Sequence, residues 1–590
     1  MNKNALLAVL LSALLLVAWA FVNAKFFPQK QTQSNQTVAE SVNSTETSEV
    51  KDEANAEMKA AETEPAEEEV VESTYVITTN KLKVTFTNRG GDVISLQLLD
   101  HKDNKTNDYI QMAENISAYN RAFAVTFDEN SKQIENSLFS VKEFEKDENG
   151  MQKIAFFKKY NGYTFVKQYS FMPDDYMFKI NILIDGADDF NGKVSYGIRT
   201  SPQIGPFYDK KTDRYENRTF LAHNGTKTKK IILNDKQNKK YEKEFNWAGI
   251  AGKYFCEIVI PENPGVIKDI YYNSDLSGFA LANAQTLFER KEITEKRTND
   301  AFYVYAGPRS EEHLKKYSEA KLNGWGFEGK RLTDGIQTYQ FLGWLEAIFK
   351  WMMQMIYKLV PNWGVSIIIM TVILKILLFP LTLKSSLGSV KMQEIQPKMT
   401  AIQNKYRDNP QKLQEETAKL YQESGYNPAS GCLPLIFQML ALFAMFDLFN
   451  NYFEFRGAGF VAGWIDDLSV GDSVWSWNRT IPFIGNNLRI LPIIYLFSQL
   501  LYGKMTQGMT AGAGAGQNAG TMKFMMYGLP IIFSFMFYNA PAGLLLFWTI
   551  SNILQFGQQA IINKVMAKKK AENNNSSVTK FPKKSNKRGK

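Results

Sequence analysis

Hydrophobic residues follow two different patterns along this chain of 590 residues. Over residues 74–318, short runs alternate apolar and polar positions, as in YVITT and MFKINILID, and Asn, Asp, Gly and Pro separate the runs. Alternation with a period of two predicts antiparallel β-strands. Beyond residue 360, long apolar segments replace this alternation. We therefore expect a large β-sandwich domain followed by a helical region.

Six apolar segments suggest membrane-spanning helices, which need about 20 mostly apolar residues. They are residues 5–22, 363–383, 432–449, 488–502, 522–537 and 543–562. The first predicts a retained N-terminal anchor over residues 1–24, although Val22-Asn23-Ala24 also resembles a signal-peptidase site, so a cleaved signal peptide stays open. The expected fold class is a multi-span α-helical membrane protein with six transmembrane helices and an all-β domain.

Two polar stretches connect these parts. Residues 25–73 are rich in Glu, Ser, Thr and Asn and have almost no aromatic residues, which predicts a disordered acidic linker. Residues 319–360 form a connector whose apolar residues recur at helical spacing from Phe341 to Leu359, with charges between them. We expect an amphipathic helix at the membrane surface, with packing of its apolar face against the β-domain as the alternative.

The loop charges predict the orientation in the membrane. Residues 384–428 contain seven Lys or Arg, whereas residues 451–487 contain two beside four acidic residues. By the positive-inside rule the first loop is cytoplasmic and the second is exported. The same rule places the basic tail over residues 567–590 in the cytoplasm, and an even number of spans places the N-terminus there too. The β-domain is then exported.

Lys375 is the most unusual residue of the apolar segments. It is the one charge within residues 363–383, and a lysine near the centre of a spanning helix costs at least about 2.5 to 3.5 kcal/mol on insertion scales. One interpretation is that the side chain extends to the headgroups, yet Leu383 lies about 12 Å further along the helix. The other is that Lys375 faces a hydrated pocket that attracts anionic groups.

Other polar side chains recur inside the last apolar segments. Each is explained equally well as a hydrogen-bonding contact between helices, but together with Lys375 they suggest one wet cavity. These residues are Gln499, Trp548, Ser551, Asn552, Gln555, Gln558 and Gln559.

Residues 384–428 predict a helical hairpin. Apolar residues recur every three or four positions on both sides of Asp408-Asn409-Pro410, which suits a helix start, and the second helix is expected to end at Gly425. Its basic face would bind nucleic acid or anionic lipid, or would simply be solvated.

Several site types lack support. The two cysteines, Cys256 and Cys432, fall in different compartments, and the three histidines are widely scattered, so no disulfide framework, zinc site or histidine-based triad is expected. Residues 324–330 match the first part of a P-loop, but Arg331 replaces its metal-binding Ser or Thr. We therefore expect no enzyme activity, metal or other cofactor.

Several motifs together resemble a known family. NWGVSIIIMTVILKILLFPLT, EIQPKMTAIQNKY, NPASGCLPLIFQM, WIDDLS and PAGLLLFWTISNILQFGQQ resemble, in this order, the core of the YidC/Oxa/Alb membrane protein insertases. NRGGD, WAGIAGKYFCEIVIP and YVYAGPRSEE look like the periplasmic domain of Gram-negative YidC. The resemblance covers nearly everything from about residue 75 to residue 565.

This resemblance implies a membrane protein insertase and chaperone of the bacterial inner membrane. It implies a five-helix core over residues 361–566 around a hydrophilic groove, and a periplasmic β-super-sandwich. The groove cation of the family is typically Arg, and Lys375 keeps the charge but loses the planar fork. The candidate groove residues are Lys375, Gln438, Gln499, Trp548, Ser551 and Asn552.

The resemblance also implies partners: nascent membrane proteins, the ribosome, the Sec translocase and the lipid bilayer, with no specific nucleic-acid sequence. The candidate contacts for ribosomes or targeting factors are Lys391, Lys398, Lys405, Arg407, Lys568, Lys569 and Lys570.

Two other functions remain open from the residues. A secondary transporter would use Lys375 to bind an anionic solute, but the chain shows neither inverted repeats nor broken helices. A carbohydrate-binding or carbohydrate-processing exported domain is the third class, because the expected sandwich resembles sugar-epimerase folds, and fold alone does not confer function.

Overall fold

The computed structural model describes residues 70–104, 106–127, 133–160, 162–186, 194–207, 216–233, 236–275, 283–336, 342–425, 428–481, 484–510 and 524–578. The predicted anchor and nearly all of the predicted linker lie outside the described residues. The contacts divide the chain into two compact units. We call them the β unit, within residues 45–338 and including 451–454, and the helical unit, within residues 339–450 and 455–590.

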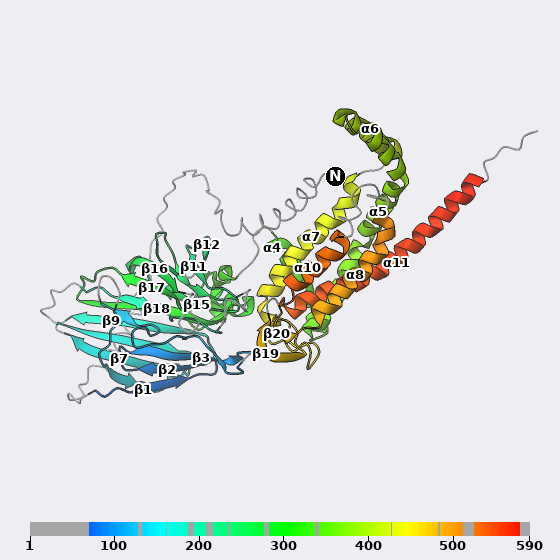
Figure 1. The fold of residues 1–590 in the computed structure, drawn as a ribbon. Coiled ribbons are helices and arrows are strands. Elements are labelled where there is room, and N and C mark those ends of the chain that lie inside the picture. Colours follow the sequence, from blue (N-terminus) through cyan, green and yellow to red (C-terminus); the bar gives the residue numbers. More distant parts are fainter. Residues whose placement is uncertain are drawn as a thin grey trace, which may run out of the picture. The chain divides into compact units, whose positions relative to one another are not determined.

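The described residues of the β unit form three antiparallel sheets, whose strands are labelled in Figure 1. In strand order, the nine-stranded sheet is β12 (Thr228–Ile232), β11 (Thr219–His223), β14 (Trp247–Ala251), β15 (Phe255–Pro261), β18 (Arg297–Pro308), β9 (Met177–Gly186), β8 (Tyr163–Phe171), β7 (Gln152–Tyr160) and β6 (Ser140–Glu143). The five-stranded sheet is β13 (Lys236–Tyr241), β16 (Ile267–Asp275), β17 (Asn283–Arg290), β10 (Gly197–Arg199) and β5 (Val125–Thr126). The four-stranded sheet is β1 (Thr74–Thr78), β2 (Leu82–Thr87), β3 (Asp92–Lys102) and β4 (Tyr109–Gln111).

Alternation along the strands produces the core of the β unit. In β9, Ile180, Ile182 and Ile184 are fully buried, whereas the residues between them are half-buried. The core also takes side chains from the other two sheets, including Phe86 of β2 and Phe288 of β17. The predicted β-rich domain is therefore present, and the short helix α3 (Glu311–Lys315) follows its last strand.

The turn between β2 and β3 shows why two glycines stand in the NRGGD motif. Gly90 and Gly91 have φ values of 70° and 61°, and a Cβ on Gly91 would lie 2.6 Å from Cβ of Phe156. The following Asp92 is fully buried, and its two carboxylate oxygens accept from Lys167 Nζ at 2.7 Å and Arg121 Nε at 2.9 Å. The turn is thus fixed both by backbone conformation and by a buried ion-pair network.

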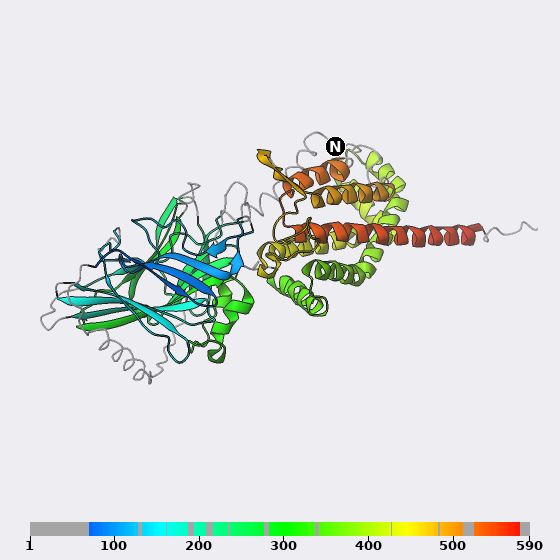
Figure 2. The same ribbon diagram turned by 90° about the horizontal axis from the view of Figure 1, so that it is seen from below.

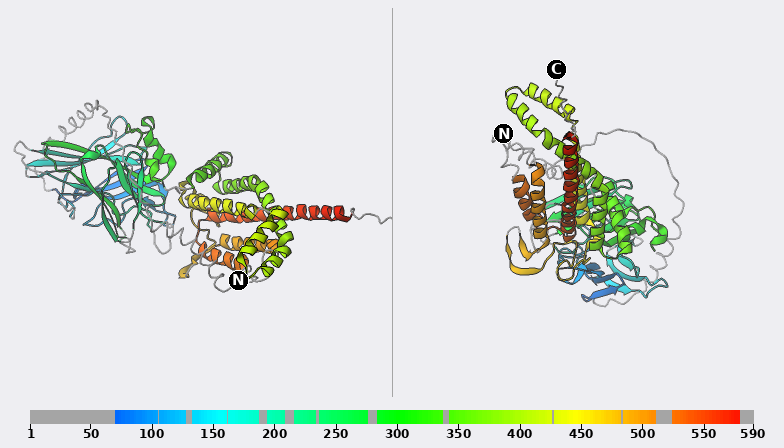
Figure 3. Two further views of the ribbon diagram at one scale, coloured as in Figure 1. Left: turned by 90° about the horizontal axis from the view of Figure 1, so that it is seen from above. Right: turned by 90° about the vertical axis from the view of Figure 1, so that its right-hand side faces the viewer.

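The helical unit contains seven α-helices among its described residues. They are α4 (Gly343–Leu359), α5 (Trp363–Lys405), α6 (Pro410–Ser424), α7 (Pro428–Asn451), α8 (Leu491–Thr510), α10 (Leu529–Met536) and α11 (Ala542–Val578). A π-helical turn, Phe524–Gly528, precedes α10, and a β-hairpin of β19 (Trp475–Ile481) and β20 (Gly485–Leu488) precedes α8. α11 extends well beyond its neighbours (Figure 2). α6 and the β19–β20 hairpin lie at opposite ends of the helical unit (Figures 1 and 3).

One described helix is long and apolar enough to cross a membrane by length and composition, the Trp363–Lys384 portion of α5. The predicted count of six transmembrane helices is thus not established. α10 has eight residues, fewer than its apolar segment predicts. α5 does not end with its own apolar segment, residues 363–383, but continues through Pro397 to Lys405. The predicted span and the first arm of the predicted hairpin therefore form one helix.

Helix α4 occupies the position of the predicted amphipathic helix. Leu345, Phe349 and Met353 are buried on the face that it turns inward, and α4 packs against α5. Large apolar side chains on the other face are exposed, including Trp344 and Trp351, both 61% exposed. This exposure is typical of a helix that lies at a membrane surface.

Candidate functional site

Helix α11 carries a row of polar side chains where it packs against α5 and α8. Asn552, Gln555 and Gln559 follow one another at spacings of three and four residues, which places them on one side of the helix. Asn552 and Gln559 are buried, and Gln555 is half-buried. The row places hydrogen-bonding groups between helices in an otherwise apolar segment.

Lys375 of α5 reaches this row on α11. Its Nζ donates to Oε1 of Gln555 at 3.1 Å, and Nε2 of Gln555 donates to the hydroxyl of Tyr502 on α8 at 2.9 Å. Nε2 of Gln558 donates to the backbone carbonyl of Lys375 at 2.9 Å. In the described part of the chain, no carboxylate lies within 4.0 Å of Lys375 Nζ. This half-buried cation therefore faces a neighbouring helix and has a neutral hydrogen-bond partner.

A second set of hydrogen bonds joins α8 and α11 one helical turn before Gln555. Nδ2 of Asn552 donates to Oγ of Ser498 at 3.1 Å, while Nε2 of Gln499 lies 3.4 Å from Oδ1 of Asn552 and 3.2 Å from the hydroxyl of Tyr495. Together with the Lys375 contacts they form what we call the polar seam. Its members are Lys375, Tyr495, Ser498, Gln499, Tyr502, Asn552 and Gln555.

Trp548 lies on α11 one turn before Asn552 and is 8% exposed. Its ring packs against those of Tyr495 and Phe537, with centroids 5.6 Å and 5.0 Å away. Its indole Nε1 is buried, and no described residue accepts its hydrogen. Because buried donors are normally paired, Trp548 offers a hydrogen-bond donor beside the polar seam.

The structure thus brings four predicted site residues, Lys375, Gln499, Trp548 and Asn552, to adjoining faces of three helices. Ser551 is half-buried on α11 next to them, and the side chain of Gln438 on α7 lies outside the described residues. The sequence prediction missed three members of the seam on α8. These members are Tyr495, Ser498 and Tyr502. They lie four residues before, one residue before and three residues after Gln499, a spacing that places all of them on one face of the helix. This spacing was the signal available in the sequence.

Comparisons with known proteins cover both units. The family model described as YidC periplasmic domain matches residues 74–355, and the model described as 60Kd inner membrane protein matches residues 355–570. The membrane protein insertase YidC of Treponema denticola is 42% identical over 96% of this chain and all of its own length. The chain belongs to the YidC family.

Two further known proteins are similar to this chain. The membrane protein insertase YidC of Treponema pallidum is 35% identical over 97% of this chain and all of its own length. A crystal structure of an active YidC insertase is 20% identical and covers 87% of this chain and 99% of that chain, with a TM-score of 0.34. The predicted family is confirmed, and with it a membrane protein that has a periplasmic β-rich domain and a C-terminal helical region.

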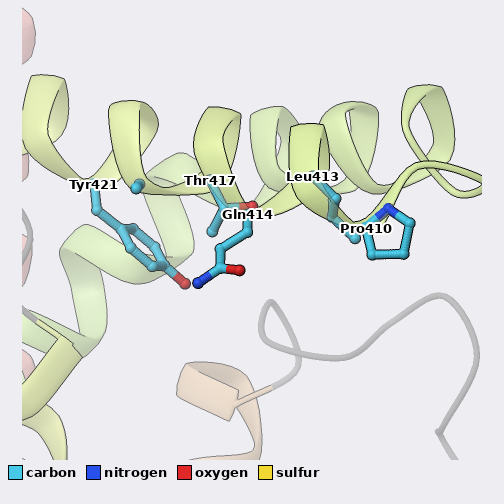
Figure 4. A pocket seen from close by; sticks show the side chains of 6 residues that line it. Pro410, Leu413, Gln414, Thr417 and Tyr421 are labelled. Atoms are coloured by element: carbon cyan, nitrogen blue, oxygen red, sulfur yellow. The ribbon is translucent and has the colours of Figure 1, made fainter.

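The hairpin of α5 and α6 in this YidC-family chain has a small core of its own. Ile395, Met399 and Leu420 are buried against one another. Outside that core, one side of α6 forms a shallow hollow lined by Pro410, Leu413, Gln414, Thr417, Ala418 and Tyr421 (Figure 4). The predicted contacts Lys398, Lys405 and Arg407 are exposed, whereas the side chains of Lys391 and Lys568 to Lys570 lie outside the described residues.

The β unit brings together two histidines that are far apart in the sequence. The rings of His101 and His313 have centroids 6.4 Å apart, and His101 Nε2 lies 3.0 Å from the hydroxyl of Tyr176, which donates to Asp100 at 3.0 Å. Burial lowers the pKa of His313, which favours the neutral ring. Among the described residues, no three His, Cys, Asp or Glu residues are grouped as metal ligands.

Proposed function

We propose that this chain inserts membrane proteins into the bacterial inner membrane, and helps them fold, by holding a polar segment of the substrate at the polar seam. Lys375 carries the proposal, because its half-buried ammonium is hydrogen-bonded to the neutral amide of Gln555. A cation without a carboxylate partner attracts anionic groups, and surroundings of low dielectric constant strengthen that attraction.

The polar seam would lower the barrier for a hydrophilic substrate segment. An acidic segment would approach Lys375, while the amides and hydroxyls of α8 and α11 replace some of its hydrogen bonds to water. The membrane potential would assist an acidic segment by about 2.3 kcal/mol per charge per 100 mV. The apolar helix of the substrate would then enter the lipid, driven by about 0.8 kcal/mol for each buried CH₂ group.

The proposal includes the finer architecture expected from the sequence. Six transmembrane helices, five of them forming the core, would place both termini and the hairpin in the cytoplasm and an all-β super-sandwich in the periplasm. Exposed cations of the hairpin would meet ribosomes or targeting factors through phosphate attraction, which is sequence-independent and salt-sensitive. The Sec translocase is a proposed partner for some substrates. The loop charges and membership in the YidC family support these assignments.

The test is protease-protected insertion of a single-span client by the full chain in liposomes. Two clients differ only in whether their translocated segment carries Asp and Glu or the matching Asn and Gln. Lys375→Met removes the charge at similar length, and Lys375→Arg keeps it. A hydrogen bond to a charged group contributes about 1.5 to 3 kcal/mol. We therefore expect Lys375→Met to slow insertion of the acidic client by about ten- to a hundredfold.

Comparison among clients and variants separates the mechanism from a folding defect. The neutral client should be inserted equally by wild type and Lys375→Met, and Lys375→Arg should retain insertion of both clients. Lys358→Met, which removes an exposed cation of α4, should change neither rate. Equal insertion of the acidic client by wild type and Lys375→Met would refute the role of the charge. Anion flux without insertion by the wild type would favour the transporter instead.

A further inference from the structure

The β19–β20 hairpin presents apolar side chains to the outside of the helical unit. Trp475 is 67% exposed, and its ring lies 6.1 Å from that of Trp477 at an angle of 77°. Ile481, at the end of the same strand, is 41% exposed, and Val474 at the base is 38% exposed. An exposed apolar cluster of this kind marks an interaction surface.

A buried carboxylate fixes the base of the hairpin to the start of α8. Asp472 is 2% exposed, and its Oδ2 accepts from the backbone N–H groups of Ile490 at 2.7 Å and Leu491 at 2.9 Å. Arg489 Nη1 donates to the carbonyl of Asp472 at 2.8 Å, and a Cβ on Gly471 would lie 2.2 Å from that same nitrogen. The hairpin is therefore held in place relative to α8 rather than attached by a free loop.

The exposed surface of the hairpin continues along the outer face of α8. Ile493, Phe497 and Leu501 recur every four residues on α8 and are 39%, 62% and 56% exposed. Exposed apolar patches mark protein or membrane interaction sites, and on a membrane protein this stripe suits contact with lipid. Since Leu491 begins α8 directly after the hairpin, Trp475 stands beside the end of this stripe.

The composition of the hairpin identifies what covers it. Tryptophan is enriched where the bilayer meets water, because its ring is apolar and its N–H is polar. Residues 473–488 contain the exposed Arg479 and no acidic residue, a charge that suits phosphate headgroups. We propose that the β19–β20 hairpin lies in the interfacial layer of the bilayer leaflet at the end of the helical unit opposite α6, with Trp475 as its main lipid contact.

This placement goes beyond the proposed insertion mechanism, since it assigns a lipid contact to an element outside the polar seam. It would hold the end of α8 at a fixed depth, and α8 carries Gln499 and Tyr502 of the seam. The bilayer, rather than a substrate, would then be the constant partner of this surface.

The test measures lipid contact of the full chain in liposomes by quenching of a fluorescent label. Ser476 is exposed on β19, and Ser476→Cys is labelled with nitrobenzoxadiazole after Cys256→Ala and Cys432→Ala. The liposomes contain phosphatidylcholine and phosphatidylglycerol, with a nitroxide either near the headgroup or deep in the acyl chain. We expect the shallow nitroxide to reduce emission strongly and the deep nitroxide to reduce it less.

Labels at two other positions calibrate the result. Phe497→Cys on the outer face of α8 should be quenched, and Gln411→Cys at the exposed start of α6 should not. Replacing Trp475 and Ile481 by Ser should bring the Ser476→Cys label towards the unquenched level. A label that is unquenched while Phe497→Cys is quenched would overturn the proposal. So would emission that is blue-shifted but insensitive to nitroxide lipids, because a protein would then cover the hairpin.

Discussion

Glu257 in the β unit makes the stability of this protein depend on pH in a defined direction. The residue lies on β15 and is fully buried, with Oε1 accepting from the backbone N–H of Ser201 at 2.9 Å and Oε2 lying 2.5 Å from Oγ of Ser201. Burial raises the pKa of Glu257 to about 7, although the Ser201 hydrogen bonds oppose the shift. The folded state therefore binds this proton more tightly than the unfolded state.

The size of the effect follows from the two pKa values. With 4.5 for the unfolded chain and about 7 for the folded one, the difference of about 2.5 units corresponds to about 3.4 kcal/mol. Since the folded pKa is the higher one, this stability is complete below pH 4.5 and is lost as the pH rises through 7. Between pH 5.5 and pH 8 the loss amounts to about 2 kcal/mol.

Glu257→Gln removes the titration at nearly constant volume, and Cys256 next to it reports unfolding. The Cys256 thiol is fully buried, and burial raises its pKa to about 12, so it reacts with a maleimide only after the β unit opens. Pulse labelling of the full chain in urea, in a Cys432→Ala background, gives the free energy of unfolding at each pH. We expect the stability of Glu257→Gln relative to wild type to increase by about 2 kcal/mol from pH 5.5 to pH 8.

Comparison with the variant isolates this one group. Glu114, whose pKa burial also raises to about 7, is present in both proteins, so its contribution cancels. A stability difference that stays constant over this pH range would refute the reasoning, because Glu257 would then titrate alike in the folded and unfolded chains.

Two further predictions concern backbone conformation and capping. Gly91→Ala should lower the stability of the β unit by about 2 to 4 kcal/mol in the same labelling assay, because the added Cβ clashes with Phe156 at a position of positive φ. The control Gly326→Ala has a φ of 69° with open space around it, so it should cost only about 1 kcal/mol. A similar loss for both would contradict the steric argument. Asn409→Ala should cost about 1 kcal/mol, because Asn409 Oδ1 accepts from the N–H of Lys412 at 3.1 Å at the start of α6. Faster amide hydrogen exchange in α6 checks this, and the exposed control Gln411→Ala should leave exchange unchanged; equal effects of the two substitutions would exclude a capping role.

Local signals in the sequence were sufficient where neighbouring residues decide the structure. Asn409 caps α6 with Pro410 in its first turn, and Gly425 ends it with a φ of 59°, as their residue types predict. The alternation in MFKINILID likewise predicted the strand β9, and the structure buries its apolar positions Ile180, Ile182 and Ile184. In each case the conformation follows from residues within one or two turns of the chain.

Contacts between distant residues were beyond the reach of these signals. His101 and His313 are scattered in the sequence and meet because β3 and the start of α3 come together. In the sequence, Tyr502 looks like an ordinary residue of an apolar segment. Only the structure shows that its hydroxyl accepts a hydrogen bond from Gln555. The β19–β20 hairpin was predicted only as an exported loop, although the alternation of apolar and polar residues in Trp475-Ser-Trp-Asn478 indicated a strand.

In the proposed mechanism, the neutral character of the polar seam would keep Lys375 available to a substrate. A carboxylate in place of Gln555 would form a buried ion pair, and a substrate would then have to break that pair before binding, at a cost of several kcal/mol. The amide of Gln555 satisfies one donor of the ammonium and leaves its charge uncompensated by the described residues. Because Gln555 is held in turn by Tyr502, the position of the cation is fixed without neutralising it. The proposed release of the substrate into lipid would require this combination of a fixed position and a charge that no described carboxylate pairs.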